Sequence, residues 1–315
     1  MIISAITPCQ KHDYLTETIL QGLEELGHKV CVSDVGNSIY QAYSEKKFID
    51  IANQSDCLLV FFGKIRGNNP PKYYLYDKIK KKCKTAYIDG SEWTYSGYPN
   101  ENQTILSKKD SRFRKGYPWI NEVFFKKCDF YFKRECYPED QDNNIIPLPF
   151  AVIKKYIFNE KNIVKKNDIF CSFGQTNDGL RFEIEHFLKK WNSEYSITVE
   201  KGLSYDLYLK KIASSKLCVD AWGGGDCNAR FWEIVANKSC IVYQKHNIII
   251  PYPYRDLFNC IEFKTVKEFE EKIVYVLNNK ELLEEITNNC YEHTMKYHTS
   301  HHRAKYMLEK MGLNS

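Results

Sequence analysis

The stretch VDAWGGGDCNARFWEIV, residues 219–235, joins an apolar run to a helical pattern through three consecutive glycines, Gly223, Gly224 and Gly225. Glycines let a backbone approach a ligand closely, and the first turn of the following helix offers unpaired N–H groups that suit a phosphate. An apolar strand, a glycine loop and a helix in this order are typical of α/β sheets that bind ligands at the strand ends. The spacing matches neither GxxxxGK[ST] nor GxGxxG, so neither of these phosphate-binding motifs applies.

The charged side chains after the glycines are regularly spaced. Asp226, Arg230 and Glu233 stand at i, i+4 and i+7, which predicts that they share one face of the helix. Such a face could offer a cation to a diphosphate and a carboxylate to ribose hydroxyls. An ordinary surface helix with an aspartate N-cap and an Arg–Glu pair is the alternative interpretation. The apolar positions point the other way, toward a core: Phe231, Ile234 and Val235.

Outward from this segment, short apolar runs alternate with helical patterns along the whole chain, which predicts parallel sheets with helices on both faces. The length of 315 residues suits about two domains. We therefore expect an α/β protein of two Rossmann-like, doubly wound domains that face a central cleft. The boundaries place an acceptor-side domain at 1–152 and a donor domain at 153–315, whose final helix could pack back on the first domain. Helices are expected near the following residues: 15–26, 48–52, 73–83, 180–191, 205–214, 228–237 and from 266 onward.

Composition narrows the class of protein. With 43% hydrophobic and 15% aromatic residues, a disordered chain is excluded. The twelve cysteines form no CxxC pair, which excludes zinc-ribbon and thioredoxin-type motifs and favours a reduced, cytoplasmic chain. No apolar stretch approaches the roughly 18 residues of a membrane span. The net charge of +5 is too small to indicate nucleic-acid binding, but lysine-rich patches leave peripheral attachment to the inner face of a membrane open.

Further polar candidates follow the strands of the first half. Asp89 and Glu92 come after the fourth strand, where a carboxylate could deprotonate an acceptor hydroxyl. His12 and Asp13 follow the first strand, and a His–Asp pair at this position could act as a general base. The alternatives are an Asp–Gly turn at residue 89, a helix N-cap at Asp13 and a loop position for His12. Four histidines near the end are expected on a solvated helix rather than at a metal: His293, His298, His301 and His302.

The segment 230–236, RFWEIVA, resembles the "R-x-x-E-x-x-A" helix of GT-B glycosyltransferases, closest to the CgeB-like group 1 family. Residues 254–258, 265–269 and 298–304 are also similar, so the resemblance covers about 165–310. It implies a nucleotide-diphosphate sugar as co-substrate, with no cofactor and no metal. The donor-binding residues that it implies are Gly174, Gln175, Thr176, Arg181, Gly223, Gly224, Gly225, Asp226, Asn228, Arg230 and Glu233.

Retaining members of this architecture carry two glutamates, eight positions apart. Glu233 corresponds to the later one, and Gly225 stands at the position of the earlier one. Whether the anomeric centre is retained or inverted therefore stays open. The resemblance implies transfer of a sugar to a glycan, lipid-linked or protein acceptor. Two alternatives remain: a nucleotide-sugar epimerase or hydrolase of the same fold, and a nucleic-acid-modifying (DNA-glycosylating) or nucleic-acid-binding protein, which the small net charge disfavours.

Overall fold

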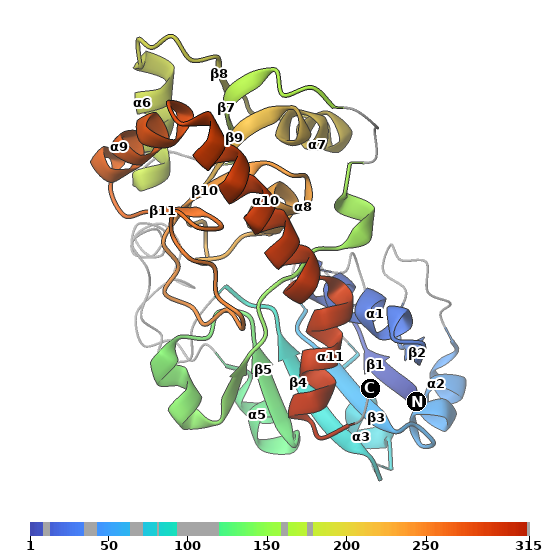
Figure 1. Cartoon of the computed structure of the whole chain (residues 1–315). Helices are drawn as coiled ribbons and strands as arrows, with labels where there is room; N and C mark the ends of the chain where they lie inside the picture. Colours follow the sequence, from blue (N-terminus) through green and yellow to red (C-terminus); the bar gives the residue numbers. More distant parts are fainter. Residues whose placement is uncertain are drawn as a thin grey trace.

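The protein contains two separate parallel sheets, each at the centre of its own domain (Figure 1). The computed structural model describes residues 1–8, 13–34, 43–63, 72–80, 82–92, 120–158, 163–174 and 179–313. Within them, all strand pairs are parallel, which requires a crossover after each strand and places helices on the sheet faces. No described helix is long and apolar enough to cross a membrane.

The amino-terminal sheet has six strands in the order β2-β1-β3-β4-β5-β6. Its order reverses beside β1, so the carboxyl ends of the central strands open toward the other domain. The strands are β1 Ile2–Ile6, β2 Lys29–Val32, β3 Cys57–Phe61, β4 Lys84–Asp89, β5 Phe130–Lys133 and β6 Ile145–Pro147. The helices described among them are α1 Tyr14–Glu25, α2 Glu45–Ala52, α3 Leu75–Lys78 and α5 Glu122–Lys127, with the 3-10 turn η2 at Pro138–Asn143.

The carboxy-terminal sheet has five strands in the order β11-β10-β9-β7-β8. Its strands are β7 Asn167–Cys171, β8 Ile197–Val199, β9 Ser215–Asp220, β10 Cys240–Gln244 and β11 Ile261–Phe263. The accompanying helices are α6 Leu180–Lys190, α7 Tyr205–Ala213, α8 Ala229–Ala236, α9 Val266–Leu277, α10 Lys280–Tyr297 and α11 Ser300–Lys310. The 3-10 turn η3, Lys154–Tyr156, lies on the segment that joins the two sheets.

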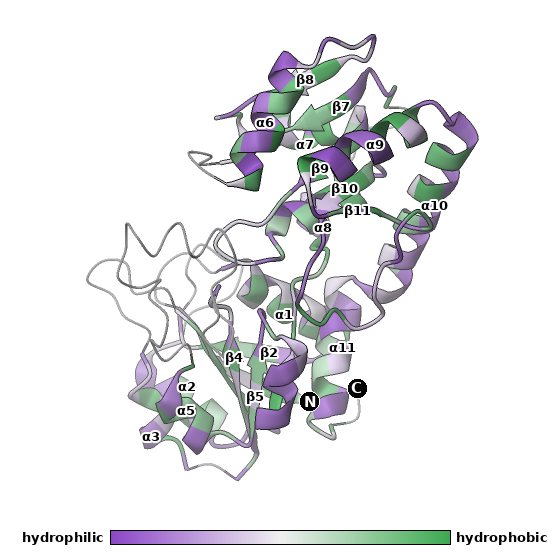
Figure 2. Cartoon of the chain, turned by 90° about the vertical axis from the view of Figure 1, so that its left-hand side faces the viewer, coloured by the Kyte–Doolittle hydropathy of each residue, from purple (hydrophilic) through white to green (hydrophobic). Residues whose placement is uncertain are grey.

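Burial of the strands explains why these segments form sheets. β3 and β10 are buried along their whole lengths, as expected for parallel strands covered on both faces. Figure 2 shows β7 in hydrophobic green, whereas the surrounding helices carry green and purple stretches. One apolar cluster continues from the first domain into the second through Phe150 and Val152, so the domains share part of their core.

The chain crosses between the domains twice, and the two crossings pair with each other. Val152 N donates to the carbonyl of His298 at 2.8 Å, and Ser300 N donates to the carbonyl of Val152 at 2.9 Å. Helix α10 runs from the second domain toward the first, and α11 then packs beside α1 (Figure 1). A Cβ on Gly22 would lie 2.0 Å from the Ser300 carbonyl oxygen, so only glycine allows these helices to approach so closely.

Most of the expected strands and helices form, with two corrections in the first domain. The lysine-rich helix expected over 73–83 is wrong, because helical structure covers only α3 and Ile79 already has an extended backbone. The proline-containing segment at 143–150, expected as a crossing only, also contains β6, the edge strand paired with β5. The described cysteines are all free thiols.

Candidate functional site

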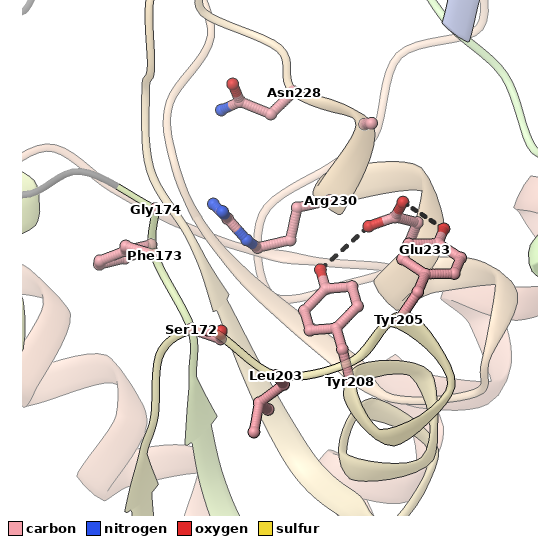
Figure 3. Close-up of a pocket in the computed structure, with 11 residues that line it drawn as sticks. Ser172, Phe173, Gly174, Leu203, Tyr205, Tyr208, Asn228, Arg230 and Glu233 are labelled. Atoms are coloured by element: carbon pink, nitrogen blue, oxygen red, sulfur yellow. Dashed lines mark hydrogen bonds between the residues drawn. The ribbon is translucent and has the colours of Figure 1, made fainter.

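A pocket of about 450 Å³ opens at the carboxyl edge of the second sheet (Figure 3). Three segments form it: the end of β7, the loop before α7 with that helix, and the first turns of α8. Arg230 and Glu233 reach it from α8, one helical turn apart, as their spacing predicts. The other lining residues are Ser172, Phe173, Gly174, Gly202, Leu203, Tyr205, Tyr208, Asn228 and Ala229.

Among the described residues that line this pocket, Glu233 carries the carboxylate, and two tyrosines bind it. Tyr205 donates its hydroxyl to Glu233 Oε1 at 2.6 Å, and Tyr208 donates to Oε2 at 3.0 Å (Figure 3). Burial raises the pKa of Glu233, while the two tyrosine hydrogen bonds act in the opposite direction. The carboxylate is therefore fixed in place, with one lone pair of each oxygen still able to accept from a ligand.

Two arginines stand beside Phe173 at the wall of the pocket, and Arg230 is the one that lines it. The guanidinium groups of Arg181 and Arg230 lie 5.3 and 5.2 Å from the centre of the Phe173 ring. Burial, together with the neighbouring Arg230, lowers the pKa of Arg181 to about 10. Both arginines remain charged near neutral pH, so this wall carries concentrated positive charge that suits a diphosphate.

Arg230 is anchored by Asp220, the last residue of β9. Its Nη1 donates to Asp220 Oδ1 at 2.9 Å. Asp220 Oδ2 and Arg230 Nε are buried polar atoms, among the residues described, that have no hydrogen-bond partner. Such groups cost free energy unless something pairs with them. The Arg230–Asp220 pair is therefore incomplete at the edge of the pocket.

The glycine loop faces the first domain. A Cβ on Gly224 would lie 2.3 Å from Glu92 Oε2, and one on Gly225 would lie 2.4 Å from Glu135 Oε1 and 2.6 Å from an Arg134 guanidinium nitrogen. These glycines therefore admit carboxylate and guanidinium groups of the first domain against the loop backbone. Of the carboxylates expected to act on the acceptor side, the structure brings Glu92 to the glycine loop.

Asp226, expected on the donor-binding face of α8, lies elsewhere. The helix begins at Ala229 with Asn228 as its N-cap, so the predicted common face with Arg230 is wrong, and the alternative interpretation with an aspartate N-cap is wrong as well. Asp226 accepts from the Tyr137 hydroxyl at 3.2 Å and from Asn247 N at 2.9 Å. Three residues separate the glycines from the helix, so Asp226 lies in the loop and its side chain contacts the first domain.

A buried carboxylate that the sequence analysis did not select completes this contact. Glu135 Oε2 accepts from Asp226 N at 2.9 Å, and its Oε1 accepts from Arg134 Nε at 2.9 Å. Burial raises the pKa of Glu135 to about 7, and Asp226 adds to this shift while Arg134 opposes it. A position two residues beyond the end of β5, at the carboxyl edge of the sheet, is the signal that could have indicated it.

Two of the remaining acceptor-side candidates, Asp89 and Asp13, occupy structural positions. Asp89 is buried, where Tyr131 and Lys133 donate to its Oδ2 at 2.6 and 3.0 Å. Asp13 caps α1, because its Oδ1 accepts from Thr16 N at 2.7 Å. His12 lies outside the described residues. The catalytic roles assigned to these side chains stay predictions.

Only some of the other expected donor-binding residues lie in the described part of the chain. Gly174 and Asn228 line the pocket, and Asn228 Nδ2 donates to the Ala221 carbonyl at 2.9 Å. Arg181 donates to the same carbonyl, at 2.7 Å from its Nη2. Gln175 and Thr176 lie outside the described residues. Tyr205 and Tyr208 were not selected from the sequence, although their i, i+3 spacing on a helix before β9 could have indicated them.

The histidines near the end of the chain are not all on a solvated face. His298 is buried between the crossing segments, and its Nε2 lies 2.9 Å from the Tyr252 carbonyl oxygen. The prediction of a solvated cluster is therefore wrong for this residue, because α10 ends where the domains meet. Within the described part of the chain, no group of three or more His, Cys, Asp or Glu side chains gathers to hold a metal ion.

Residues 165–309 match the family model described as "Glycosyl transferase-like". The carboxy-terminal domain is therefore similar to this family. The match covers the pocket and the Arg230–Glu233 helix, and it confirms the expected glycosyltransferase function at the level of this family. A sequence search of curated proteins finds no match.

Solved structures show the same two-domain fold. An alpha-glucosyltransferase in complex with UDP-glucose and DNA containing an abasic site is similar with a TM-score of 0.59 and 12% identity, covering 99% of this chain and 98% of that one. Anabaena HepE with UDP and glucose gives 0.60 and 8%, covering 99% of both chains. A Rickettsia africae glycosyltransferase gives 0.60 and 10%, covering 98% and 97%. The GT-B architecture expected from the sequence is thereby confirmed.

Proposed function

We propose that this glycosyl transferase-like protein moves a hexose-like sugar from a UDP-sugar to a hydroxyl of a glycan, lipid-linked or protein acceptor. The observation that carries the proposal is that Arg230 and Glu233 lie together on the helix that follows the glycine loop, and both line the pocket. The cation suits a diphosphate and the carboxylate suits ribose hydroxyls. UDP is the nucleotide bound in two of the similar structures, which supports its choice here.

Departure of the nucleotide diphosphate places negative charge where the protein offers positive charge. Arg230 in the pocket wall is held by Asp220 and the neighbouring Arg181 by the Ala221 carbonyl, so little reorganisation is needed as that charge develops. The N–H groups at the start of α8 add a favourable dipole. We propose on this basis that transfer needs no metal ion, and an excess of EDTA should leave the transfer rate unchanged.

On the acceptor side we propose Glu92 as the carboxylate that acts on the acceptor hydroxyl if the anomeric centre is inverted. Its carboxylate lies against Gly224, whereas Asp89 is already held by Tyr131 and Lys133 inside the first domain. We expect Glu92→Gln to lower kcat by about 10²-fold while leaving the Kd for UDP within about twofold. An unchanged kcat would remove Glu92 from the mechanism.

The epimerase or hydrolase alternative requires several acids and histidines around the anomeric carbon. The described lining of the pocket offers one carboxylate, Glu233, and contains no histidine. Sugar transfer therefore fits this pocket better. A cytoplasmic location, supported by the free thiols of the described cysteines, is part of the proposal, and peripheral contact with the inner face of a membrane is compatible with it.

The deciding experiment is a thermal-shift screen of the purified chain with UDP, GDP and dTDP, followed by donor hydrolysis and transfer assays with UDP-sugars. We expect UDP to raise the Tm by several degrees, since a ligand at about 100 times its Kd stabilises the folded state by about 2.7 kcal/mol. An acceptor panel of glycans, a lipid-linked sugar, a peptide and DNA then separates the acceptor classes. Absence of stabilisation by every nucleotide would overturn the proposal.

A further inference from the structure

Two tyrosines of α7 converge on the carboxylate that the proposed function assigns to the ribose. Tyr205 and Tyr208 stand at i, i+3, so both face Glu233 from one side of their helix. Each donates to a different oxygen, at 2.6 and 3.0 Å, which fixes both the position and the rotation of the carboxylate plane (Figure 3). One hydrogen bond would leave that rotation free, but two do not.

The tyrosines are themselves held by packing. The Tyr205 ring lies edge-on to Tyr156 with ring centres 5.2 Å apart, and Tyr208 lies 6.2 Å from Phe170. Tyr205 is 42% exposed at the pocket mouth. The backbone of Glu233 is tied by a hydrogen bond from Asn237 Nδ2 to its carbonyl at 2.7 Å. The carboxylate therefore has little freedom before any ligand arrives.

A fixed carboxylate can bind a pair of neighbouring hydroxyls with one oxygen for each, and this bidentate contact depends on orientation. A ribose presents such a pair at C2′ and C3′, whereas a 2′-deoxyribose presents one hydroxyl only. We propose that Tyr205 and Tyr208 are positioning residues that orient Glu233 and thereby make donor binding selective for ribonucleotides over 2′-deoxyribonucleotides. This inference rests on the proposed function, because it assumes a nucleotide in this pocket.

The charge state of Glu233 supplies a second signature. The titratable and charged groups around it come from five elements: Tyr205 and Tyr208 on α7, Arg230 on α8, Asp220 on β9, Tyr14 on α1 and Tyr156 on η3. Burial raises the pKa of Glu233, and the tyrosine hydrogen bonds and Arg230 restrain that rise. Removing a tyrosine hydroxyl should therefore raise the pKa further, and nucleotide binding should weaken at a higher pH than in the wild type.

The test is calorimetric titration with UDP and 2′-deoxy-UDP, between about pH 5 and 8. The variants are Tyr208→Phe, Tyr205→Phe, Glu233→Gln and the double variant Glu233→Gln/Tyr208→Phe. Tyr195→Phe is the matched control, since its hydroxyl donates to Asn278 at an exposed site on the other side of the domain. Thermal unfolding without nucleotide shows whether each variant is folded. If Tyr208→Phe does not fold, Tyr205→Phe carries the test, because Tyr205 is half-exposed.

We expect the wild type to prefer UDP, and each single tyrosine variant to bind UDP roughly tenfold more weakly with most of that preference lost. The acidic limb of binding should move to higher pH in both variants. In the Glu233→Gln background, Tyr208→Phe should add no further loss, because the tyrosine acts through the carboxylate. Independent, additive losses or an unmoved pH profile in variants that otherwise bind UDP would overturn this inference alone. Failure of the wild type to bind UDP, GDP or dTDP would instead overturn the proposed function, and the inference with it.

Discussion

In each sheet one strand ends in an aspartate that forms an ion pair, Asp89 with Lys133 in the first domain and Asp220 with Arg230 in the second. The two pairs differ in how many of their polar atoms have hydrogen-bond partners. Asp89 and Lys133 are 3% and 0% exposed, and both carboxylate oxygens have protein donors, Ser91 N on Oδ1 and Lys133 with Tyr131 on Oδ2. Asp220 and Arg230 are 1% and 16% exposed, and each retains a buried polar atom without a partner within the described structure.

This difference separates a structural pair from a binding pair. A buried ion pair in which both carboxylate oxygens and the cation already have protein partners holds its strands together and does not need a ligand to complete it. A pair with unsatisfied atoms at a pocket wall can complete its hydrogen bonding when a ligand arrives. Presence of an aspartate and a cation at a strand end is therefore a weak indicator of function, and the state of their hydrogen bonds is a stronger one.

The largest expected effect tests the structural side of this comparison. Lys133→Met should lower the free energy of unfolding by about 3–5 kcal/mol, because it leaves the Asp89 charge buried without its partner. Chemical denaturation measures this change. Lys216→Met is the control, since Lys216 and its partner Asp168 are 40% and 19% exposed and the expected loss is about 1 kcal/mol or less. Equal losses in the two variants would contradict a structural role for the Asp89–Lys133 pair.

The second effect tests the binding side. Arg230→Ala should lower kcat/KM by about 10²-fold, because an arginine that contacts the departing diphosphate stabilises the transition state, while part of the charge remains on Arg181. Steady-state kinetics with a UDP-sugar measure it. Arg255→Ala provides the control, because Arg255 lies exposed on Phe258, outside the pocket lining. If Arg230→Ala impaired stability but not kcat/KM, the distinction between the pairs would collapse.

The smallest effect concerns the carboxylate between the two domains. The folded protein raises the pKa of Glu135 from 4.5 to about 7, so it holds this proton more tightly than the unfolded chain does. The resulting stability is fully present below about pH 4.5 and is lost as the pH rises toward 7. Glu135→Gln should flatten the fall in Tm across this window by a few degrees, whereas the exposed Glu139→Gln should not. Parallel Tm profiles for wild type and Glu135→Gln would contradict this assignment.

The sequence predicted the elements that depend on local pattern and failed where distant segments meet. Apolar runs located the strands, and the spacing of Arg230 and Glu233 placed both side chains in the pocket. The lysine-rich pattern at 73–83 predicted too long a helix, since helical structure covers Leu75–Lys78 and the backbone of Ile79 is already extended. The Glu135–Asp226 contact joins positions 91 residues apart, and no spacing rule indicates such a pair.

The same limit applies to the tyrosines around Glu233. Their i, i+3 spacing is visible in the sequence, but the hydrogen bonds bridge 28 and 25 residues and depend on how α7 docks beside α8. Asp226 shows the opposite failure, since its helical spacing to Arg230 was clear and yet the helix begins three residues later. Local periodicity thus indicated which polar side chains lie near each other along one segment, but not which distant segments they contact.

The approach of α11 to Gly22 has a consequence for how the molecule is made. Gln21 contacts Ser300 across 279 residues, so the first sheet to leave the ribosome lacks the helix that covers α1 until α11 is synthesised. During that interval an apolar face of α1 stays uncovered and is available to chaperones. The first domain therefore gains this covering helix only after the residues that line the donor pocket have been synthesised.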